Sequence, residues 1–389
     1  MNRLANSLFP IVNILGAAIA VFAVTMLAPL TVAFVRDEGA LIAYDTAFLI
    51  TFASGATLWL ATRRFRRELQ PRDGFLLVTL IWTVLPAFST LPLLLHLPGL
   101  SFTDAYFETV SGLTTTGATT LSGLDALPAS INFWRCLLQW IGGMGMVTIF
   151  VALFPVLGIG AARLVDAETP GPHNEKLRSR PTSAARSLWL LYLGFTGLEL
   201  LLLMTGGRLP FYDALNVSFA SMATGGFLHL QQSIGAFSDS TFVTTVVTIS
   251  MLAAGTNFSL YYFAIRRRES AMLSRSPEFR LYIGIFLAAA LMITVDLVRA
   301  DVMPVGAALQ HATFQVASIQ TTTGFTTADY DLWPSLSRGV LLTLMLIGGC
   351  AGSTAGGLKV VRLLVVAKYA ARHIMMAFNP RTVAAIKLG

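Results

Sequence analysis

Three short segments rich in threonine and glycine dominate this sequence, because their residue types could bind a cation. They are Thr114–Gly117, Ala223–Gly226 and Thr321–Gly324. Aligning their last glycines without gaps brings three upstream pairs to one offset, namely Asp104-Ala105, Asp213-Ala214 and His311-Ala312. A repeat that recurs about every hundred residues indicates one structural unit used several times.

The chemistry that such segments allow is the coordination of a monovalent cation by backbone oxygens. Carbonyl groups can replace the water around a potassium ion when they line a narrow path. Glycine adopts the unusual backbone angles that this requires, while threonine favours extended backbone and adds a hydroxyl oxygen. None of the three segments contains a carboxylate. One such segment alone is typical of an ordinary turn, but three in register predict a potassium filter.

The composition places these segments in a membrane protein. The 389 residues are 55% hydrophobic and only 12% charged, whereas soluble domains are about 25% charged. Eight apolar runs are long enough to cross a bilayer, which takes about 20 residues. They are 11–33, 41–61, 75–96, 133–158, 187–205, 241–264, 280–298 and 338–358. The first run is too long for a cleaved signal peptide and is expected to be a helix.

The basic residues indicate the orientation of these runs. All but five of the 27 Lys and Arg residues precede the first run or follow an even-numbered one, and the exceptions are Arg36, Arg135, Arg208, Arg299 and Arg338. Positive residues stay preferentially on the cytoplasmic side of a membrane. The N-terminus and the basic loops are therefore predicted to be cytoplasmic, and the Thr/Gly segments fall on the outer side. This distribution also explains the net charge of +7 without a nucleic-acid partner.

The segment before each filter is too short or too polar to span the bilayer and is predicted to be a re-entrant half-helix. These segments are Phe102–Leu113, Phe211–Met222 and Val305–Gln320. Non-helical backbone survives at membrane depth only where protein or water covers it, and the C-terminal end of a half-helix attracts a cation. The expected fold is an all-α polytopic membrane protein, with about eight transmembrane helices and three half-helices around a central pore.

Each repeat is expected to contain a helix, a half-helix, a filter and a second helix. The predicted divisions are an N-terminal helix pair, the first pore repeat, a cytoplasmic loop, the second and third pore repeats, and an amphipathic cytoplasmic tail. Their bounds are 1–70, 71–162, 163–186, 187–268, 269–362 and 363–389. The polar loop Asp166–Arg186 could dock a regulatory partner or serve as a solvated linker.

Longer stretches around the filters resemble the Trk-type potassium uptake transporters, the TrkH/KtrB family. The matching stretches are Ser111–Thr119, Trp140–Gly145, Ala254–Phe258 and Gly348–Lys359. The N-terminal helix pair and the ending Ile386–Gly389 are similar to the longer TrkH branch. The resemblance covers essentially the whole chain.

The resemblance implies a potassium uptake protein of the bacterial inner membrane rather than an enzyme. Its potassium ligands would be backbone or hydroxyl oxygens of Thr115, Thr116, Gly117, Thr224, Gly225, Gly226, Thr322, Thr323 and Gly324. Gly117 favours potassium, because relatives that pass sodium often have serine there. The implied partners are potassium ions, membrane lipid, a second copy of the chain in a homodimer and a cytosolic nucleotide-binding TrkA-like subunit. No organic cofactor is implied.

The glycine-rich stretch of the eighth run has two interpretations. Its small residues and the lysine after them are Gly348, Gly349, Gly352, Ser353, Thr354, Gly356, Gly357 and Lys359. Such residues can pack helices closely, but each glycine costs a helix about 1 kcal/mol relative to alanine. We favour an intramembrane loop that obstructs the pore below the filter, a gating role that the family resemblance supports. Lys359 could add a barrier to cations or lie at the membrane interface.

Three other polar residues have a structural and a functional interpretation. An acid within a membrane segment is a candidate functional residue. Glu108 could pair with Arg135 or attract cations at the pore mouth, and we favour structural pairing for both Glu108 and Glu199. His311 takes the position of an aspartate in the other repeats. We expect it to be a hydrogen-bonded residue of the half-helix rather than a pH sensor.

The resemblance implies a pore of four such units, and the filter spacing would place the fourth filter about a hundred residues beyond Gly324, which is past Gly389. A fourfold pore needs a fourth wall of carbonyls, because an open side would leave backbone groups facing lipid. The chain is therefore expected either to be an incomplete potassium transporter or to be a three-filter subunit that does not conduct and serves regulation or assembly. An intramembrane enzyme is disfavoured, because the sequence has no His-Glu-x-x-His motif, paired intramembrane Asp or Ser/His arrangement.

Overall fold

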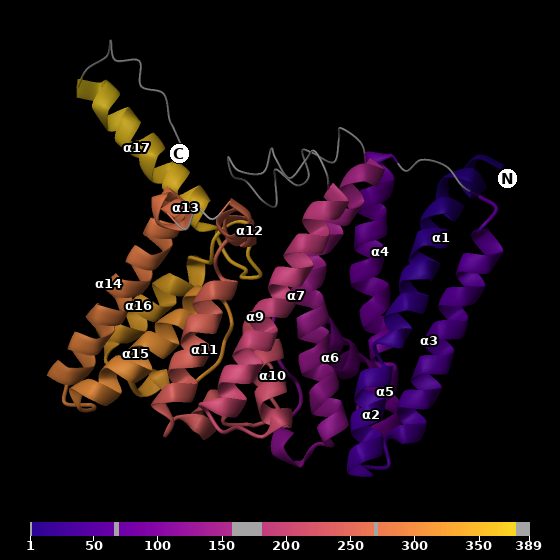
Figure 1. Cartoon of the computed structure of the whole chain (residues 1–389), viewed down its shortest axis with the longest axis horizontal. Coiled ribbons are helices and arrows are strands. Elements are labelled where there is room, and N and C mark those ends of the chain that lie inside the picture. Colours follow the sequence, from indigo (N-terminus) through magenta and orange to yellow (C-terminus); the bar gives the residue numbers. More distant parts are fainter. Residues whose placement is uncertain (1, 66–69, 158–180, 268–270, 379–389) are drawn as a thin grey trace. The chain divides into compact units, whose positions relative to one another are not determined.

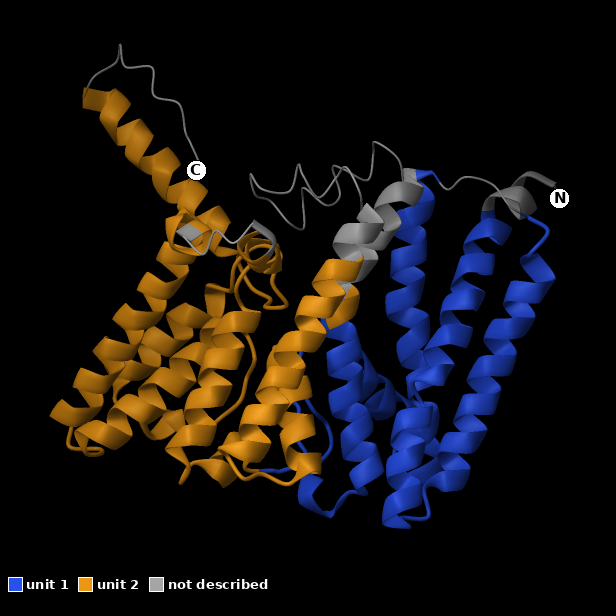
Figure 2. Ribbon diagram, in the orientation of Figure 1, with its two compact units in different colours: residues 1–143, 152–162, 227–231 blue, residues 144–151, 163–226, 232–389 orange. Residues whose placement is uncertain are grey.

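The computed structural model describes residues 2–65, 70–157, 181–267 and 271–378 (Figure 1). The chain divides into two compact units (Figure 2). The first contains residues 1–143, 152–162 and 227–231, and the second contains residues 144–151, 163–226 and 232–389. The first half-helix therefore lies in the first unit, and the other two lie in the second.

The first unit is a bundle of apolar helices around one half-helix. Its elements are α1 (Asn2–Val24), α2 (Leu27–Arg36), α3 (Leu41–Thr62), α4 (Pro71–Ser89), α5 (Leu91–His96), the half-helix α6 (Phe102–Leu113), the short η1 (Leu124–Ala126) and the first half of α7 (Ala129–Leu157). Ile11, Leu15 and Ile19 recur along one face of α1 and form a buried core with Leu77 of α4. Burying such a face is what stabilises an amphipathic helix in a bundle.

The start of α7 is set by a carboxylate from a distant loop. Glu38 accepts hydrogen bonds from the backbone amides of Ala129 at 2.9 Å and Ser130 at 3.0 Å. The first amides of a helix have no partner within it, and a negative charge there also complements the helix dipole. The hydroxyl of Tyr44 on α3 donates to the carbonyl of Ser130 at 2.9 Å. These contacts fix the helix that packs behind the first filter.

The second unit repeats the plan of helix, half-helix and helix twice. Its elements are α9 (Pro181–Thr205), the half-helix α10 (Phe211–Met222), η3 (Ser233–Phe237), α11 (Thr241–Ala254), α12 (Phe258–Arg267), α13 (Ala271–Arg275), α14 (Pro277–Arg299), the half-helix α15 (Val305–Gln320), η4 (Tyr330–Leu332), α16 (Ser335–Leu346) and α17 (Val360–Phe378). Asp296 of α14 caps α16, because its carboxylate accepts from the backbone amide and the hydroxyl of Ser337. The half-helices lie where the sequence predicts them.

Five described helical stretches are long and apolar enough to cross a membrane. They are Leu8–Arg36, Leu41–Thr62, Arg72–His96, Arg186–Thr205 and Pro277–Arg299. Each agrees with a predicted run. The predicted run 133–158 falls on α7, a helix of 29 residues.

Two predicted runs differ from the structure. The run 241–264 is not one straight helix, because α11 and α12 meet at an angle of 92°. The run 338–358 is not a spanning helix, because α16 ends at Leu346 and the following residues form a loop. Hydropathy detected the apolar composition of both runs, but glycines and the contacts described below break the helices.

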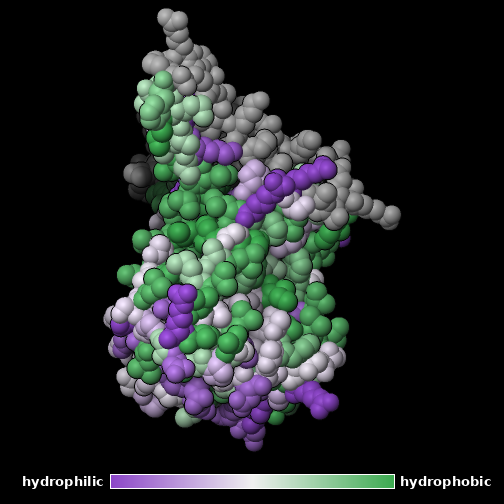
Figure 3. All heavy atoms as spheres, turned by 90° about the vertical axis from the view of Figure 1, so that its left-hand side faces the viewer, coloured by the Kyte–Doolittle hydropathy of each residue, from purple (hydrophilic) through white to green (hydrophobic). Residues whose placement is uncertain are grey.

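The face of the second unit that presents α14 and α16 is suited to lipid. Figure 3 shows an apolar band across this side of the molecule, with hydrophilic residues gathered at the end where α14 finishes. The exposed apolar side chains include Leu287, Leu291, Leu342 and Leu346. A broad apolar surface of this kind marks contact with lipid or another protein.

Candidate functional site

The three filters share one unusual backbone geometry. Two positions in each have positive φ, with values of 56° and 78° at Thr115 and Gly117, 51° and 80° at Thr224 and Gly226, and 57° and 84° at Thr322 and Gly324. Positive φ is unfavourable for a β-branched residue and costs of order 1–3 kcal/mol. The same strained threonine in three segments far apart in sequence indicates a functional requirement rather than a local accident.

The amides of each filter bond back to the half-helix before it. Thr115, Thr224 and Thr322 donate to the carbonyls of Gly112, Ser221 and Ile319, each at 3.0 Å. The next residues, Thr116, Gly225 and Thr323, donate to the carbonyls of Ser111, Ala220 and Ser318 at 2.9, 2.9 and 2.8 Å. A trans peptide unit points its carbonyl opposite to its N–H. The carbonyls of Thr115, Thr224 and Thr322, which share peptide units with the second set of amides, therefore point away from the half-helices.

The second and third filters, both in the second unit, approach each other closely. A Cβ atom on Gly226 would lie 2.0 Å from the carbonyl oxygen of Thr323. Thus the glycine is needed for two reasons, its positive φ and the approach of the neighbouring backbone. The structure brings together six of the predicted ligand residues here, and the remaining three, Thr115 to Gly117, belong to the first unit.

The aligned residues Asp104, Asp213 and His311 lie in different surroundings. Asp104 and Asp213 lie in the first turns of α6 and α10, where an acidic side chain complements the helix dipole. His311 lies in the second turn of α15, and its Nδ1 is 3.1 Å from the hydroxyl oxygen of Thr327. The expectation that His311 is a hydrogen-bonded residue of the half-helix is confirmed.

The glycine-rich stretch after α16 is a loop, so close packing of a continuous helix is excluded. Its two ends come together, because the amide of Gly348 donates to the carbonyl of Leu358 at 3.0 Å. A Cβ atom on Gly348 would lie 1.9 Å from the carbonyl oxygen of Gly356, so this crossing requires glycine. Lys359 donates from Nζ to the carbonyl of Ala355 in the same loop.

The loop is also bonded to the break between α11 and α12. The amide of Cys350 donates to the carbonyl of Gly255 at 2.9 Å, and the amide of Phe258 donates to the carbonyl of Gly352 at 3.1 Å. These bonds satisfy backbone groups that the 92° bend removes from helical pairing. From the other side, Glu278 of α14 accepts from the amide of Ala351 at 2.7 Å. The bend between α11 and α12 and the glycine-rich loop therefore satisfy each other's backbone hydrogen bonds.

The same loop contacts the second and third filters directly. The Thr354 hydroxyl is 3.2 Å from the Thr224 hydroxyl and donates toward the carbonyl of Met222 at the end of α10. The amide of Gly356 donates to the hydroxyl of Thr322 at 2.7 Å. Thr224 and Thr322 are the strained residues of their filters. The loop therefore forms hydrogen bonds with the hydroxyl groups of two predicted ligand residues.

Glu108 and Arg135 form a buried ion pair in the first unit. Arg135 Nε lies 2.7 Å from Glu108 Oε1, and each side chain is 1% exposed. The predicted pairing is thus confirmed, and a carboxylate that attracts cations at an open mouth is excluded for Glu108. The carboxylate also accepts from the amide of Thr120 at 3.1 Å and from the hydroxyl of Thr119. A buried charge needs such a complete set of partners.

Glu199 of α9 has neutral partners instead. It is 2% exposed, and the Ser221 hydroxyl donates to its carboxyl group at 2.6 Å, with Ser250 as a second hydrogen-bond partner. Ser221 is also the residue whose carbonyl accepts from the amide of Thr224. The side chain therefore lies behind the second filter and has a structural role, although its partner is not an arginine.

Two glutamines near the filters have polar contacts that the sequence did not predict. Gln315 of α15 donates from Nε2 to the carbonyl of Ala328 at 3.1 Å, and Gln139 of α7 accepts from the amide of Phe227 at 2.9 Å. Gln315 could have been found, because it aligns with Glu108 when the filter glycines are superposed. Gln139, like Glu278, gave no signal, because its partner is distant in sequence.

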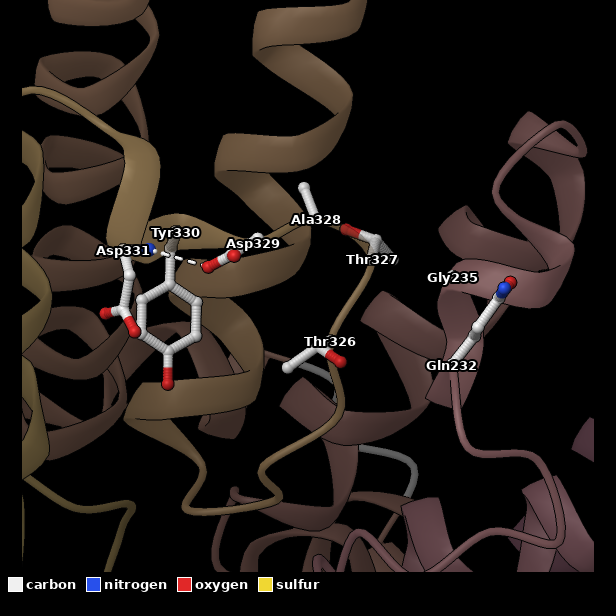
Figure 4. Close-up of a pocket in the computed structure, with 8 residues that line it drawn as sticks. All are labelled: Gln232, Gly235, Thr326, Thr327, Ala328, Asp329, Tyr330 and Asp331. Atoms are coloured by element: carbon white, nitrogen blue, oxygen red, sulfur yellow. Dashed lines mark hydrogen bonds between the residues drawn. The ribbon is translucent and has the colours of Figure 1, made fainter. Parts of the chain in front are cut away.

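An open cavity of about 480 Å³ adjoins the segment that follows the third filter. It is lined by Gln232, Gly235, Thr326, Thr327, Ala328, Asp329, Tyr330 and Asp331 (Figure 4). Asp329 uses one carboxylate oxygen to accept from the amide of Asp331 at 3.0 Å. The cavity is polar and presents oxygen atoms, which is compatible with an entrance for hydrated cations.

Comparisons with known proteins show the family of this chain. A family model described as "TrkH: Cation transport protein" matches residues 43–389. The Trk system potassium uptake protein TrkH of Salmonella typhimurium is 42% identical over 382 residues, which cover 97% of this chain and 79% of that protein. The Trk system potassium uptake protein TrkG of Escherichia coli is 32% identical over 381 residues, covering 97% and 78%.

A solved structure has the same fold. The crystal structure of the potassium transporter TrkH from Vibrio parahaemolyticus superposes with a TM-score of 0.87 at 39% sequence identity. The match covers 98% of this chain and 79% of that chain.

Proposed function

The chain belongs to the TrkH family of cation transport proteins, and on this premise we propose that it conducts potassium ions into the cell through its Thr/Gly filters. The observation that carries the proposal is the backbone geometry shared by all three filters. Each has a threonine and a glycine with positive φ and amides bonded to its half-helix. Carbonyls presented in this way replace the hydration shell of a potassium ion.

The proposed ligands are the oxygens of nine residues. They are Thr115, Thr116, Gly117, Thr224, Gly225, Gly226, Thr322, Thr323 and Gly324. Each half-helix ends at the filter and directs the negative end of its dipole toward the ion. Because an ion replaces water by fixed carbonyls, selectivity depends on how firmly these carbonyls are positioned.

We further propose that the loop Gly348–Gly357 is the gate. Its support is a pair of hydrogen bonds, in which the hydroxyl of Thr224 donates to that of Thr354 and the amide of Gly356 donates to the hydroxyl of Thr322. While the loop is docked, these two hydroxyls are engaged by protein atoms. Its withdrawal frees the same oxygens for an ion and clears the path beneath the filters. Lys359 adds a positive charge beside the loop, which opposes the passage of cations.

The family and the charge distribution support proposals for the localisation and the partners. We propose an inner-membrane protein with a cytoplasmic N-terminus, because the basic residues follow the even-numbered runs. A homodimer and a cytosolic TrkA-like nucleotide-binding subunit are the proposed partners. The loop Asp166–Arg186, considered above as a docking surface, lies outside the described residues except for Pro181–Arg186 of α9.

The test replaces Gly117 by serine in bacteria that lack their own potassium uptake systems. Serine at this position is expected to lower the discrimination between potassium and sodium by about tenfold, or about 1.4 kcal/mol, because the φ of 78° strains its backbone. Gly306→Ser is the matched control, because Gly306 lies on α15 and a Cβ there meets no atom within 4 Å.

A second readout is the thermal stability of the purified protein in potassium and in sodium chloride. A bound ion stabilises the folded state in proportion to RT ln(1 + [L]/Kd). We expect potassium to stabilise the wild-type protein more than sodium does, and the Gly117→Ser variant to lose this difference. Absence of both potassium uptake and potassium-specific stabilisation in the wild-type chain would overturn the proposal.

A further inference from the structure

The residue nine positions before the filter glycine differs among the three repeats. It is Glu108 in the first, Val217 in the second and Gln315 in the third. In the first and third repeats this side chain holds the segment that follows its own filter. Glu108 accepts from the amide of Thr120, and Gln315 donates to the carbonyl of Ala328. Valine has no polar side-chain atom and cannot do this in the second repeat.

The segment after the second filter is held instead by residues of α7. Arg135 donates from Nη1 to the carbonyl of Leu228 at 3.1 Å, and its guanidinium carbon lies 4.3 Å from the centre of the Phe227 ring. One helical turn further along, Gln139 accepts from the amide of Phe227. Leu228 aligns with Thr119 of the first repeat. Figure 2 shows residues 227–231 in the colour of the first unit, although the chain on both sides belongs to the second.

The same guanidinium also holds the segment after the first filter. Its Nε pairs with Glu108, and its Nη2 donates to the hydroxyl of Thr119 at 3.2 Å. Both post-filter segments are irregular, so their backbone groups depend on side chains for hydrogen bonds. Arginine suits this arrangement because its planar guanidinium carries five donors in fixed directions.

We propose that Arg135 is a positioning residue that holds the segment after the first filter and the segment after the second filter together within the first unit, and thereby determines ion selectivity. It replaces the anchor that the second repeat lacks at Val217. The inference about selectivity rests on the proposed function, whereas the inference about positioning does not. A lysine could retain the ion pair with Glu108, but it could not reach both segments with fixed geometry.

The primary experiment measures hydrogen exchange of the full chain in lipid nanodiscs. Arg135→Gln is expected to raise exchange at least about tenfold in two segments, residues 118–123 and 226–230, because each loses bonds to the guanidinium. Residues 325–328 of the third repeat should remain within about twofold of the wild type, because Gln315 and Ser318 anchor them independently. Glu108→Gln should affect residues 118–123 more than 226–230, because Arg135 can still bond to Leu228.

The second measurement compares potassium and sodium uptake. Arg135→Gln and Arg135→Lys are both expected to lower discrimination by about tenfold, whereas the exposed Arg338→Gln should leave it unchanged. Gly117→Ser is measured beside them. If Gly117→Ser alters selectivity and the Arg135 variants do not, the inference fails while the proposed function stands. If none of them alters selectivity, the filter assignment itself fails.

The exchange pattern decides the positioning role separately. Unchanged exchange of residues 226–230 in a folded Arg135→Gln protein would overturn it. Exchange that rises equally in all three post-filter segments would also overturn it, because that result indicates general destabilisation. The double variant Glu108→Gln/Arg135→Gln removes the buried charges together and provides a folded protein if Arg135→Gln alone does not fold. In that variant, protected residues 226–230 would again contradict the proposal.

Discussion

The first and third filters have the same backbone shape but are supported by different chemistry. Thr115 and Thr322 have φ values of 56° and 57°. Behind the first filter lies an ion pair whose two side chains are each 1% exposed. In the third repeat, neutral groups hold the segment after the filter. Gln315 donates to the carbonyl of Ala328, and the Ser318 hydroxyl donates to the carbonyl of Phe325 at 2.7 Å. Filter geometry therefore constrains the backbone but not the side chains that hold it.

Breaking the ion pair and breaking the neutral hydrogen bonds should cost different amounts of folding stability. A buried carboxylate removed from its arginine leaves an unpaired charge in a low-dielectric interior, and this costs more than one missing neutral hydrogen bond. The second repeat combines both kinds of support. Its own residue Ser221 bonds to Glu199, while Gln139 and Arg135 of α7 bond to the segment that follows the second filter.

The largest expected effect comes from breaking the ion pair. Glu108→Ala should destabilise the protein by about 3–5 kcal/mol, whereas Gln315→Ala at the equivalent position should cost about 1–3 kcal/mol. The comparison is made by thermal unfolding of the purified proteins in one detergent. Equal losses of stability in the two variants would show that the charge of the first anchor has no special role.

Filter glycines provide the next comparison. Gly226→Ala combines a φ of 80° with a Cβ only 2.0 Å from the carbonyl oxygen of Thr323. Gly324→Ala has a φ of 84°, but its Cβ meets no atom within 4 Å. We expect alanine at 324 to cost about 1–2 kcal/mol through φ alone, and alanine at 226 to add about 1–3 kcal/mol of overpacking.

Potassium uptake in a deficient strain measures this difference, with membrane levels of the protein checked by immunoblot. Gly226→Ala should abolish uptake, and Gly324→Ala should reduce it. Equal transport by the two variants would contradict the conclusion that the backbone of the third filter leaves no room for a side chain at position 226.

The smallest expected effect concerns the loop beneath these two filters. Thr354→Val keeps the side-chain shape but removes the hydroxyl that bonds to Thr224, to Met222 and to Ala254. One neutral hydrogen bond is worth about 0.5–1.5 kcal/mol, so the open state should gain about two- to tenfold in population and potassium flux should rise accordingly. Thr343→Val is the control, because its hydroxyl donates to the carbonyl of Gly339 within α16. Flux below the wild-type level in Thr354→Val would contradict the gating role.

Much of the site could be predicted, because its signals are local. The half-helices coincide with their predicted ranges, and the ion pair between Glu108 and Arg135 is confirmed. The repeat made these predictions possible, since three aligned copies reveal positions that one copy would hide. The loop was expected because several glycines within ten residues disfavour a helix, and this is what the structure contains.

The errors arose where hydropathy was taken as a measure of helical continuity. Apolar composition shows that a segment can lie in the membrane, but it does not show whether its backbone bonds stay within one helix. The run 338–358 leaves its helix at Leu346, because its amides and carbonyls find partners at Gly255, Phe258 and Glu278. Two of these partners, Gly255 and Phe258, lie at the break where the two halves of the run 241–264 meet at 92°.

The sequence alone determined the membrane class, the repeat, the half-helices and the positions of the three Thr/Gly segments, because composition and short-range patterns encode them. Tertiary structure alone decided which side chains hold the filters. Arg135 reaches Leu228 across 93 positions, and Thr354 reaches Thr224 across 130. No local pattern encodes such contacts, since they depend on where folding places groups that are distant along the chain. Strain at the filter threonines persists because these long-range contacts surround and support it.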